Sequence, residues 1–257
     1  MKKKLIVIFF LLMISILSLC NVMAKRNCIQ EKKVLLVGSA IGVKHENIIE
    51  GNDEKNSKTI NTSSQNIGIM TCIDEENGQY FAFGHAISSN NKIADLKGTK
   101  CYKTNYIGIE KSSNYKIGKL MAVSNTDSEI GDISKNTEKG VLGQVSDISI
   151  FDEKDLEEYY IGSSYNITVG PAKIYVDLDG NGLKDYDVII ENVNYFDATK
   201  NIHIKVVDIE LISKTGGMVK GMSGSPIVQN GKLIGAINCT SEKAPTEAYG
   251  IFADKFF

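Results

Sequence analysis

A serine set between glycines near the C-terminus is the stretch of this sequence best suited to covalent chemistry. Residues 221–228 read GMSGSPIV, with Ser223 two positions after Gly221 and directly before Gly224. Glycines allow backbone turns in which a serine hydroxyl faces a cleft. They also let the N–H groups of Gly221 and Ser223 point at one spot, where they would hold the oxyanion of a tetrahedral intermediate. The stretch predicts a nucleophilic serine; the alternative is a glycine-rich turn before a hairpin.

The chain order of histidine and serine narrows the class of enzyme. A nucleophilic serine needs a base, usually a histidine. The three histidines of this chain, His45, His85 and His203, all precede Ser223. An α/β-hydrolase places its histidine after its serine, so chain order excludes that class. A histidine that precedes the serine is typical of a chymotrypsin-like peptidase.

His85 is the histidine best placed to act as the base. It follows the apolar segment 80–83 and Gly84, where a predicted strand gives way to a loop. His45 lies in a segment rich in lysine and glutamate, which is typical of a solvated surface. His203 alternates with isoleucines and is expected on the exposed face of a strand. The alternative for His85 is a structural histidine at a strand end.

Short apolar strands separated by turn residues fill the chain from residue 67 onward, without a long helical period. This pattern predicts an all-β fold, which we expect to be a chymotrypsin-like double β-barrel. Residues 155–160 are expected to form one helical turn, and Asn230 with Gly231 a tight turn between the last two strands. The expected strands are 67–72, 80–83, 106–110, 117–122, 143–150, 165–169, 172–178, 186–193, 202–208, 226–228 and 233–237.

Five segments spread along the chain match one family pattern. The most specific begins at Asp208 and includes KTGGMVKGMSGSPI at residues 214–227. The others are FGHAIS at 83–88, GDISKNTEKG at 131–140, GPAKI at 170–174 and YGI at 249–251. Together they resemble the SpoIVB peptidase family, serine peptidases of endospore-forming bacteria. The resemblance runs from about Asn66 to the C-terminus and implies a serine endopeptidase that needs no cofactor.

The resemblance implies a catalytic triad of His85, Asp208 and Ser223. His85 matches the family's base, Ser223 its nucleophile, and Asp208, 15 residues before the serine, its acid. Asp208 also interrupts the apolar run 206–209, and a buried carboxylate needs a partner such as an imidazole N–H. The alternative is an outward-facing residue of an alternating strand. The other candidates for the acid are Asp95, Asp127 and Asp132.

The resemblance also implies a role in sporulation signalling. Members of the family cut the extracytoplasmic part of a membrane complex that restrains an intramembrane protease, which then releases a late sigma factor. They can also cut themselves, and they act in the space between the forespore and mother-cell membranes. The family has a PDZ domain where this chain has the polar stretch 47–65. A PDZ domain needs roughly 80–100 residues, so this stretch is expected to be an exposed linker instead.

The start of the chain predicts export. Lysines at residues 2–4 precede the apolar run 5–19, and Val22-Met23-Ala24 supplies small residues at the positions that signal peptidase reads. The segment 1–24 is therefore a secretory signal peptide or an uncleaved N-terminal anchor. In either case it meets the membrane during export.

Composition fits one exported domain of moderate size. Removing residues 1–24 leaves 26 basic and 31 acidic side chains, a net charge near −5, and nothing here suggests a nucleic-acid binder. Residues 25–65 are expected to hold an N-terminal strand and the polar linker, and 66–257 the peptidase domain. The remaining cysteines allow three full pairings, and no cysteine–histidine cluster suggests zinc. They are Cys28, Cys72, Cys101 and Cys239.

Residues 177–185, DLDGNGLKD, imitate the start of a calcium loop. Position 12 is Val188 instead of the usual glutamate, so the bidentate ligand is missing. The flanking segments are predicted strands, which favours a polar hairpin turn, and no metal site is predicted. The side chains at ligand positions 1, 3, 5 and 9 are Asp177, Asp179, Asn181 and Asp185.

Two other functions compete with an active peptidase. One is a catalytically inactive relative that binds a peptide outside the cytoplasm, and the other is a calcium-dependent β-domain. The presence of a histidine, an aspartate and a serine at all three triad positions argues against the inactive relative.

Overall fold

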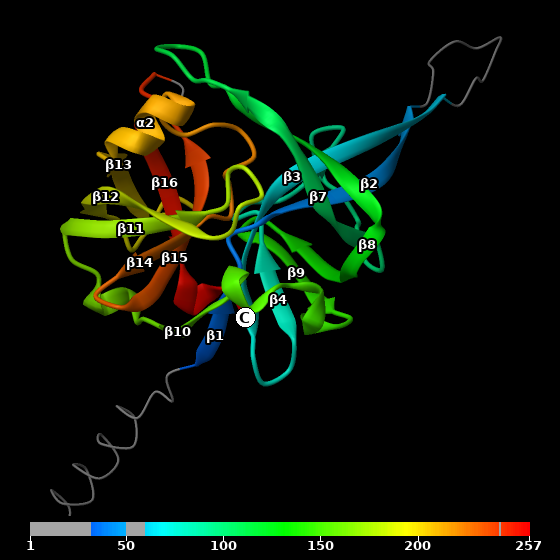
Figure 1. Ribbon diagram of the computed structural model, residues 1–257, viewed down its shortest axis with the longest axis horizontal. Helices are drawn as coiled ribbons and strands as arrows, with labels where there is room; N and C mark the ends of the chain where they lie inside the picture. Colours follow the sequence, from blue (N-terminus) through cyan, green and yellow to red (C-terminus); the bar gives the residue numbers. More distant parts are fainter. Residues whose placement is uncertain (1–31, 50–59, 242) are drawn as a thin grey trace, which may run out of the picture. The chain divides into compact units, whose positions relative to one another are not determined.

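The computed structural model describes residues 32–49, 60–241 and 243–257 (Figure 1). Within these residues, Lys33–Phe257 forms one compact unit built mostly of β-strands. The strands close into two six-stranded antiparallel barrels, which confirms the predicted all-β, chymotrypsin-like double β-barrel. The predicted signal peptide or anchor at 1–24 lies outside the described residues. Among the described helices, none is both long enough and apolar enough to cross a membrane.

The first barrel is drawn in blue to green in Figure 1 and carries the N-terminal half of the unit. Its strand order is β3-β2-β7-β8-β9-β4, and pairing between β3 and β4 closes it. Alternating apolar side chains such as Met70, Tyr80 and Ile130 fill its core, because successive residues of a strand point to opposite faces. The strands are β2 (Ala40–Ile49), β3 (Ile60–Asp74), β4 (Gln79–Ala82), β7 (Lys100–Glu110), β8 (Lys119–Thr137) and β9 (Gly140–Val145).

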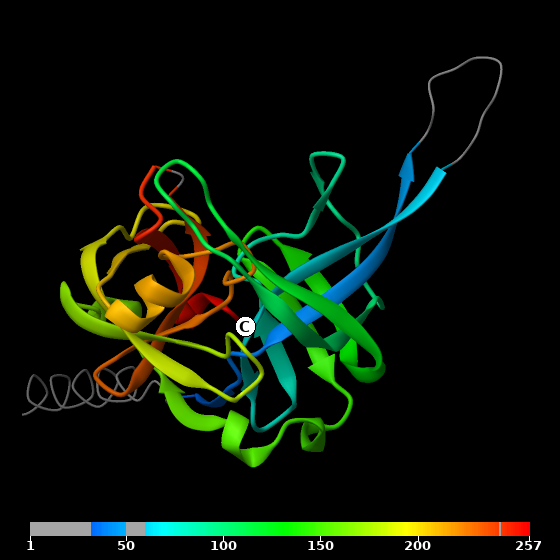
Figure 2. The ribbon, with the colours of Figure 1, turned by 45° about the horizontal axis from the view of Figure 1, so that its top comes forward.

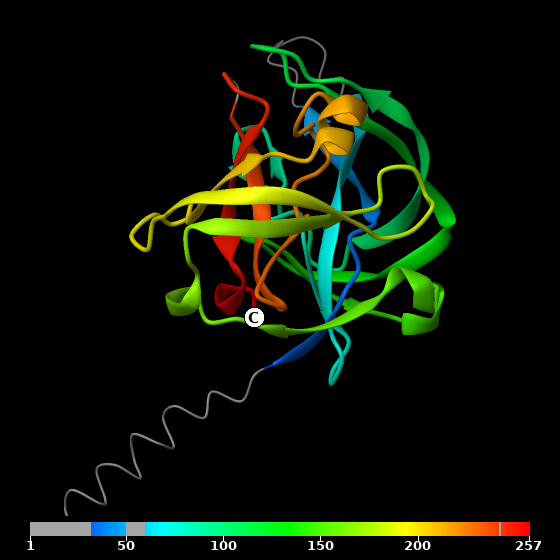
Figure 3. The ribbon, with the colours of Figure 1, turned by 60° about the vertical axis from the view of Figure 1, so that its left-hand side comes forward.

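The second barrel follows in yellow to red. Its strand order is β14-β11-β12-β13-β16-β15, closed by pairing of β14 with β15. Figure 3 shows β11 and β12 side by side, and Ile174, Tyr186 and Ile204 lie in the core beneath them. The strands are β11 (Gly170–Val176), β12 (Lys184–Val193), β13 (Ile202–Val206), β14 (Pro226–Gln229), β15 (Lys232–Thr240) and β16 (Glu247–Phe252).

Two strands outside the barrels join them. β1 (Lys33–Leu36) pairs with β3 of the first barrel and with β10 (Glu157–Ile161), and β10 pairs in parallel with β15 of the second. An apolar cluster lies at this junction, where the rings of Phe81 and Phe256 stack with centroids 3.9 Å apart. The barrels are therefore held in one arrangement by hydrogen bonds and by buried apolar surface.

The N-terminal part of the unit differs from the prediction. β2 and β3 form a long hairpin, paired from Ala40 with Ile69 to Ile49 with Ile60. The prediction of a linker over 47–65 is wrong for its described residues, because backbone pairing alone can extend a strand through polar sequence rich in threonine and serine. The peptidase unit also begins at Lys33 instead of residue 66. Residues 50–59 lie outside the description.

Some predicted elements between the barrels are also wrong. Residues 165–169, predicted as a strand, include the 3₁₀ turn η3 (Ser164–Asn166). The predicted helical turn at 155–160 is instead the end of η2 (Glu153–Asp155) followed by β10. The strand predicted at 143–150 ends at Val145, and η1 (Ile148–Ile150) follows. Short apolar runs suit both strands and turns, so periodicity alone does not separate them.

Three of the cysteines are described, and none of the three forms a disulfide bond. Cys72 is buried in the apolar cluster at the junction and Cys101 in the core of the first barrel, and Cys239 is half-buried. Burial raises the pKa of the Cys101 thiol to about 11, so this thiol stays protonated and unreactive at neutral pH. Cys28 lies outside the described residues.

Candidate active site

The structure brings His85 and Ser223 together from the two barrels. His85 follows β4 of the first barrel, and Ser223 precedes β14 of the second. His85 Nε2 lies 2.9 Å from Ser223 Oγ, a hydrogen-bonding distance for a nucleophile and its base. Two residues 138 positions apart in sequence therefore meet at the junction of the barrels.

The other ring nitrogen of His85 fixes the tautomer. His85 Nδ1 lies 2.8 Å from the backbone carbonyl oxygen of Ala86. A carbonyl oxygen only accepts hydrogen bonds, so Nδ1 carries the hydrogen and donates it. Nε2 is left with a lone pair that accepts the Ser223 hydroxyl proton. This is the tautomer that a general base requires.

The backbone before His85 is held in an uncommon conformation. Phe83 has a φ of 69° and Gly84 a φ of 63°. The left-handed region is unfavourable for phenylalanine, so the surroundings must impose it. The Phe83 N–H donates to Ile69 O at 2.9 Å, and Asn238 Nδ2 donates to Gly84 O at 2.7 Å. Both barrels thus hold the turn that presents His85.

The serine turn is held in the same way. The Ile69 N–H donates to Ser223 O at 2.8 Å, and the Gly224 N–H donates to Ile237 O at 2.7 Å. Gly224 has a φ of 96°, and a Cβ atom there would lie 2.1 Å from Ile69 O. Only glycine fits at this position, since both the conformation and the space exclude a side chain.

Two backbone donors beside Ser223 remain available. In the described part of the chain, the N–H groups of Gly221 and Ser223 donate no hydrogen bond, whereas those of Met222, Gly224 and Ser225 all do. Gly221 has a φ of 96°, which turns the chain at this point. These two N–H groups are the pair expected to hold an oxyanion.

A cavity of about 510 Å³ opens beside the pair. His85 and Ser223 lie in its wall, and Ile67, Val219 and Ile237 supply apolar surface. A site of this size and character can take an extended peptide with an apolar side chain next to the reacting bond.

Comparison with known proteins identifies the family of the chain. The family model described as SpoIVB peptidase S55 matches residues 57–257. The chain belongs to the SpoIVB peptidase S55 family. The family predicted from the sequence is thus confirmed, and the chain is a serine-type peptidase by family. A crystal structure of the Rv3671c protease from M. tuberculosis, in its active form, is similar over 85% of this chain and 78% of that chain, at 10% identity and a TM-score of 0.43. No curated protein matches the chain.

Asp208, the acid implied by the family pattern, does not contact His85 in this structure. It is the N-cap of helix α2 (Ile209–Thr215), which is orange in Figure 2. Its carboxylate accepts hydrogen bonds from Leu211 N at 2.8 Å and from Asp187 N at 3.3 Å. The predicted bond to His85 Nδ1 is therefore wrong here, since the Ala86 carbonyl occupies that nitrogen.

The prediction differs from the structure because β13 does not continue through Asp208. β13 ends at Val206, and the helix that follows was not predicted. Its signals were present: an aspartate before residues 209–215, and Gly216 after them, with a φ of 74°. The other candidate acids also lie elsewhere. Asp95 accepts from Lys97 N, Asp132 pairs with Lys100, and Asp127 is exposed.

Asp208→Asn is expected to leave activity nearly unchanged. Asparagine caps helices about as well as aspartate, and no contact with His85 is lost. The rate of serine labelling should stay within about threefold, against the roughly 10⁴-fold loss expected for a triad acid. Asp208→Ala serves as the control, because it removes the cap and should cost about 1 kcal/mol of stability. A loss near 10⁴-fold in a folded Asp208→Asn protein would show that Asp208 reaches His85 in the working enzyme.

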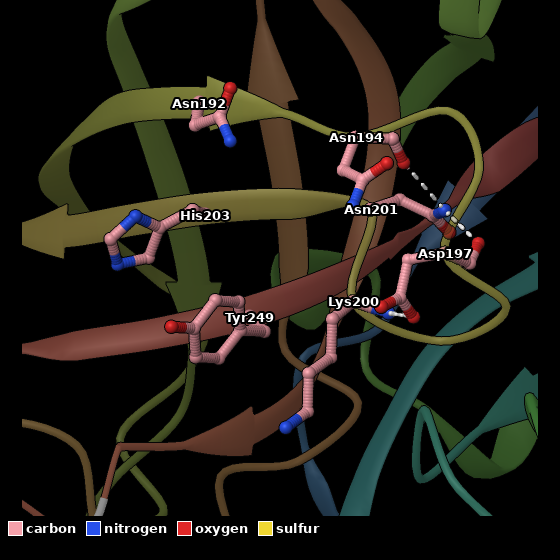
Figure 4. Close-up of a pocket in the computed structure, with 7 residues that line it drawn as sticks. All are labelled: Asn192, Asn194, Asp197, Lys200, Asn201, His203 and Tyr249. Atoms are coloured by element: carbon pink, nitrogen blue, oxygen red, sulfur yellow. Dashed lines mark hydrogen bonds between the residues drawn. The ribbon is translucent and has the colours of Figure 1, made fainter.

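His203 lies in a separate polar cavity of about 240 Å³ (Figure 4). Its ring stacks on Tyr249 with centroids 4.8 Å apart, and its nitrogens lie 3.7 Å and 3.6 Å from carboxylate oxygens of Glu191 and Glu247. The side chain is 23% exposed and lies on the face of β13 opposite the buried Ile202 and Ile204, which is the outer face predicted for it. Its ring nitrogens face these carboxylates, slightly beyond hydrogen-bond length, and do not face Ser223. The side chain of His45 lies outside the described residues.

The stretch that imitates a calcium loop connects β11 to β12. Asp177 Oδ1 accepts from the N–H groups of Asp179 and Gly180, so it stabilises the turn itself. Asp179 pairs with Lys214 at 2.5 Å, which lowers the pKa of its carboxyl group, and Asp185 pairs with Lys173. No group of three or more potential metal ligands occurs among the described residues.

Calcium is expected to change stability little. The aspartates are engaged by backbone N–H groups or lysines, and position 12 is Val188. The melting temperature should differ by less than about 2 °C between chelator and millimolar calcium. A larger shift that Asp179→Ala abolishes would show a structural metal in this loop.

Proposed function

We propose that this chain is an exported serine endopeptidase that uses Ser223 as nucleophile and His85 as base. The observation that carries the proposal is the 2.9 Å contact between His85 Nε2 and Ser223 Oγ, beside two unused N–H donors. The substrate class is a protein or peptide, because the family is a peptidase family and the adjoining cavity is partly apolar. No cofactor takes part.

The proposed reaction has two halves. Ser223 Oγ attacks the scissile carbonyl carbon while its proton passes to His85 Nε2, and the N–H groups of Gly221 and Ser223 bind the oxyanion. The C–N bond then breaks as His85 returns the proton to the leaving amine. Water repeats the sequence on the acyl-enzyme, with His85 as base, and releases the carboxylic acid. The Ala86 carbonyl dipole faces the imidazolium formed in each half.

We propose that the protein acts in sporulation, in the space between the forespore and mother-cell membranes. Its substrate there would be the extracytoplasmic part of a membrane protein, or the chain itself. Family membership supports this role, as do the basic start and apolar run at residues 2–19. Fractionation of sporulating cells tests the location, and a full-length protein that stays soluble in the cytoplasm would contradict it.

A fluorophosphonate probe tests the chemistry without knowledge of the substrate. Ser223 Oγ would form a bond to phosphorus, fluoride would leave with the P–F electron pair, and His85 would take the hydroxyl proton. Wild-type protein should be labelled on the peptide that contains Ser223. Folded wild-type protein that takes up no label would instead favour an inactive relative that binds peptides.

A further inference from the structure

One amide side chain holds the loop that follows His85. Asn136 lies near the end of β8 and reaches across to residues 87 and 94. Its Nδ2 donates to Ile87 O at 2.7 Å and to Ala94 O at 2.9 Å. Its Oδ1 accepts from the Ile87 N–H at 3.0 Å. Both amide donors are used on carbonyl oxygens, so the orientation of the amide is fixed.

The Ile87 N–H belongs to the same peptide group as the carbonyl that binds His85. Ala86 C=O accepts from His85 Nδ1, and the N–H at the other end of that planar unit donates to Asn136. Rotation of this peptide would break both contacts at once. Hydrogen bonds in such a chain also polarise one another, so the bond to Asn136 makes the carbonyl a stronger acceptor.

We propose that the peptide group between Ala86 and Ile87, which Asn136 holds by a hydrogen bond to the Ile87 N–H, orients the ring of His85. The chain of contacts runs from Asn136 Oδ1 through this peptide to His85, and from His85 Nε2 to Ser223 Oγ. Asn136 is then a positioning residue for proton transfer from Ser223. The inference rests on the proposed peptidase function and adds to it the group that sets the base.

The second barrel supplies a matched control. Asn201 Nδ2 also donates to two loop carbonyls, those of Asn194 at 3.0 Å and Asp197 at 2.7 Å (Figure 4). Asn201 is buried and holds the loop between β12 and β13, and within the described residues its side-chain hydrogen bonds reach neither Ser223 nor His85. Replacing either asparagine by alanine removes the side-chain hydrogen bonds that hold a loop, but only Asn136 contacts the peptide group that binds His85.

The test measures fluorophosphonate labelling at several probe concentrations, together with melting temperature. The maximal labelling rate of Asn136→Ala should fall roughly 10- to 100-fold, because small misplacements of a catalytic group cost this much. The probe concentration for half-maximal rate should stay within about twofold, since the cavity is unchanged. Asn201→Ala should lose a similar amount of thermal stability and label at the wild-type rate.

A second variant separates the effect of the hydrogen bond that Asn136 Oδ1 accepts from the effect of the two that Nδ2 donates. Asn136→Asp keeps an acceptor for the Ile87 N–H but loses both donors, so it should label about 10-fold faster than Asn136→Ala. Equal rates for these two variants would overturn the proposal, as would a wild-type rate in Asn136→Ala. If Asn136→Ala does not fold, Asn136→Ser replaces it, because its shorter side chain cannot span to Ile87. A wild-type protein that never labels would instead overturn the proposed function itself.

Discussion

Ser223→Ala is expected to lower peptidase activity and probe labelling by roughly 10⁴-fold or more while the protein stays folded. The hydroxyl is the only nucleophile that lies against His85 Nε2 in the described chain. Alanine is smaller and introduces no clash. The backbone bonds of the turn, including Ile69 N to Ser223 O, do not use the side chain and should persist. Labelling rate and thermal unfolding, measured on one preparation, check both parts of the expectation.

Ser225→Ala is the matched control for this prediction. Ser225 is the other serine of the turn, and its buried Oγ donates to Met222 O at 2.7 Å, away from His85. Met222 O keeps a second donor, the Ser225 N–H, so the loss should be about 1 kcal/mol of stability. Labelling should persist at a rate close to wild type. If Ser225→Ala abolished labelling and Ser223→Ala did not, the nucleophile would be misassigned.

The parts of the site that the sequence predicted are those encoded locally. Glycines on both sides of Ser223 indicated a turn, and the φ of 96° at Gly221 and Gly224 bears this out. His85 was found from chain order and from the apolar strand before it. The double barrel followed from many short strands without a helical period. Each of these features depends on residues close together in the chain.

The parts that the sequence missed depend on contacts across the fold. The group that binds His85 Nδ1 is a backbone carbonyl, which every residue carries and which no residue type reveals. Asn136 was not singled out, because its three bonds join segments 42 and 49 residues away. Asp208 was placed in a strand because an apolar run precedes it, although a helix cap explains the same residue better. Family pattern and chain order could not decide between these environments.

Gly84→Ala is expected to damage both stability and activity. Gly84 has a φ of 63°, and a Cβ atom there would lie 2.1 Å from Ile237 O, a backbone atom of β15. The same carbonyl accepts the Gly224 N–H, so it cannot move without disturbing the serine turn. We expect the free energy of unfolding to fall by roughly 4 kcal/mol or more, which is typical of a steric clash in a core. Labelling should fall about 100-fold or more, because the histidine and serine turns would separate.

Gly98→Ala isolates the contribution of the clash. Gly98 has a φ of 78°, yet no heavy atom lies within 4 Å of the position that its Cβ would take. Only the left-handed backbone conformation then disfavours alanine, and it should lower the free energy of unfolding by about 1–2 kcal/mol. The labelling rate should not change. Urea unfolding and probe labelling of both variants give the comparison. If Gly84→Ala cost no more than Gly98→Ala, the two barrels would not meet as closely at Gly84 as the structure has them. The site would then have to be held together by the Asn238 bond to Gly84 O and by the contacts of Ile69.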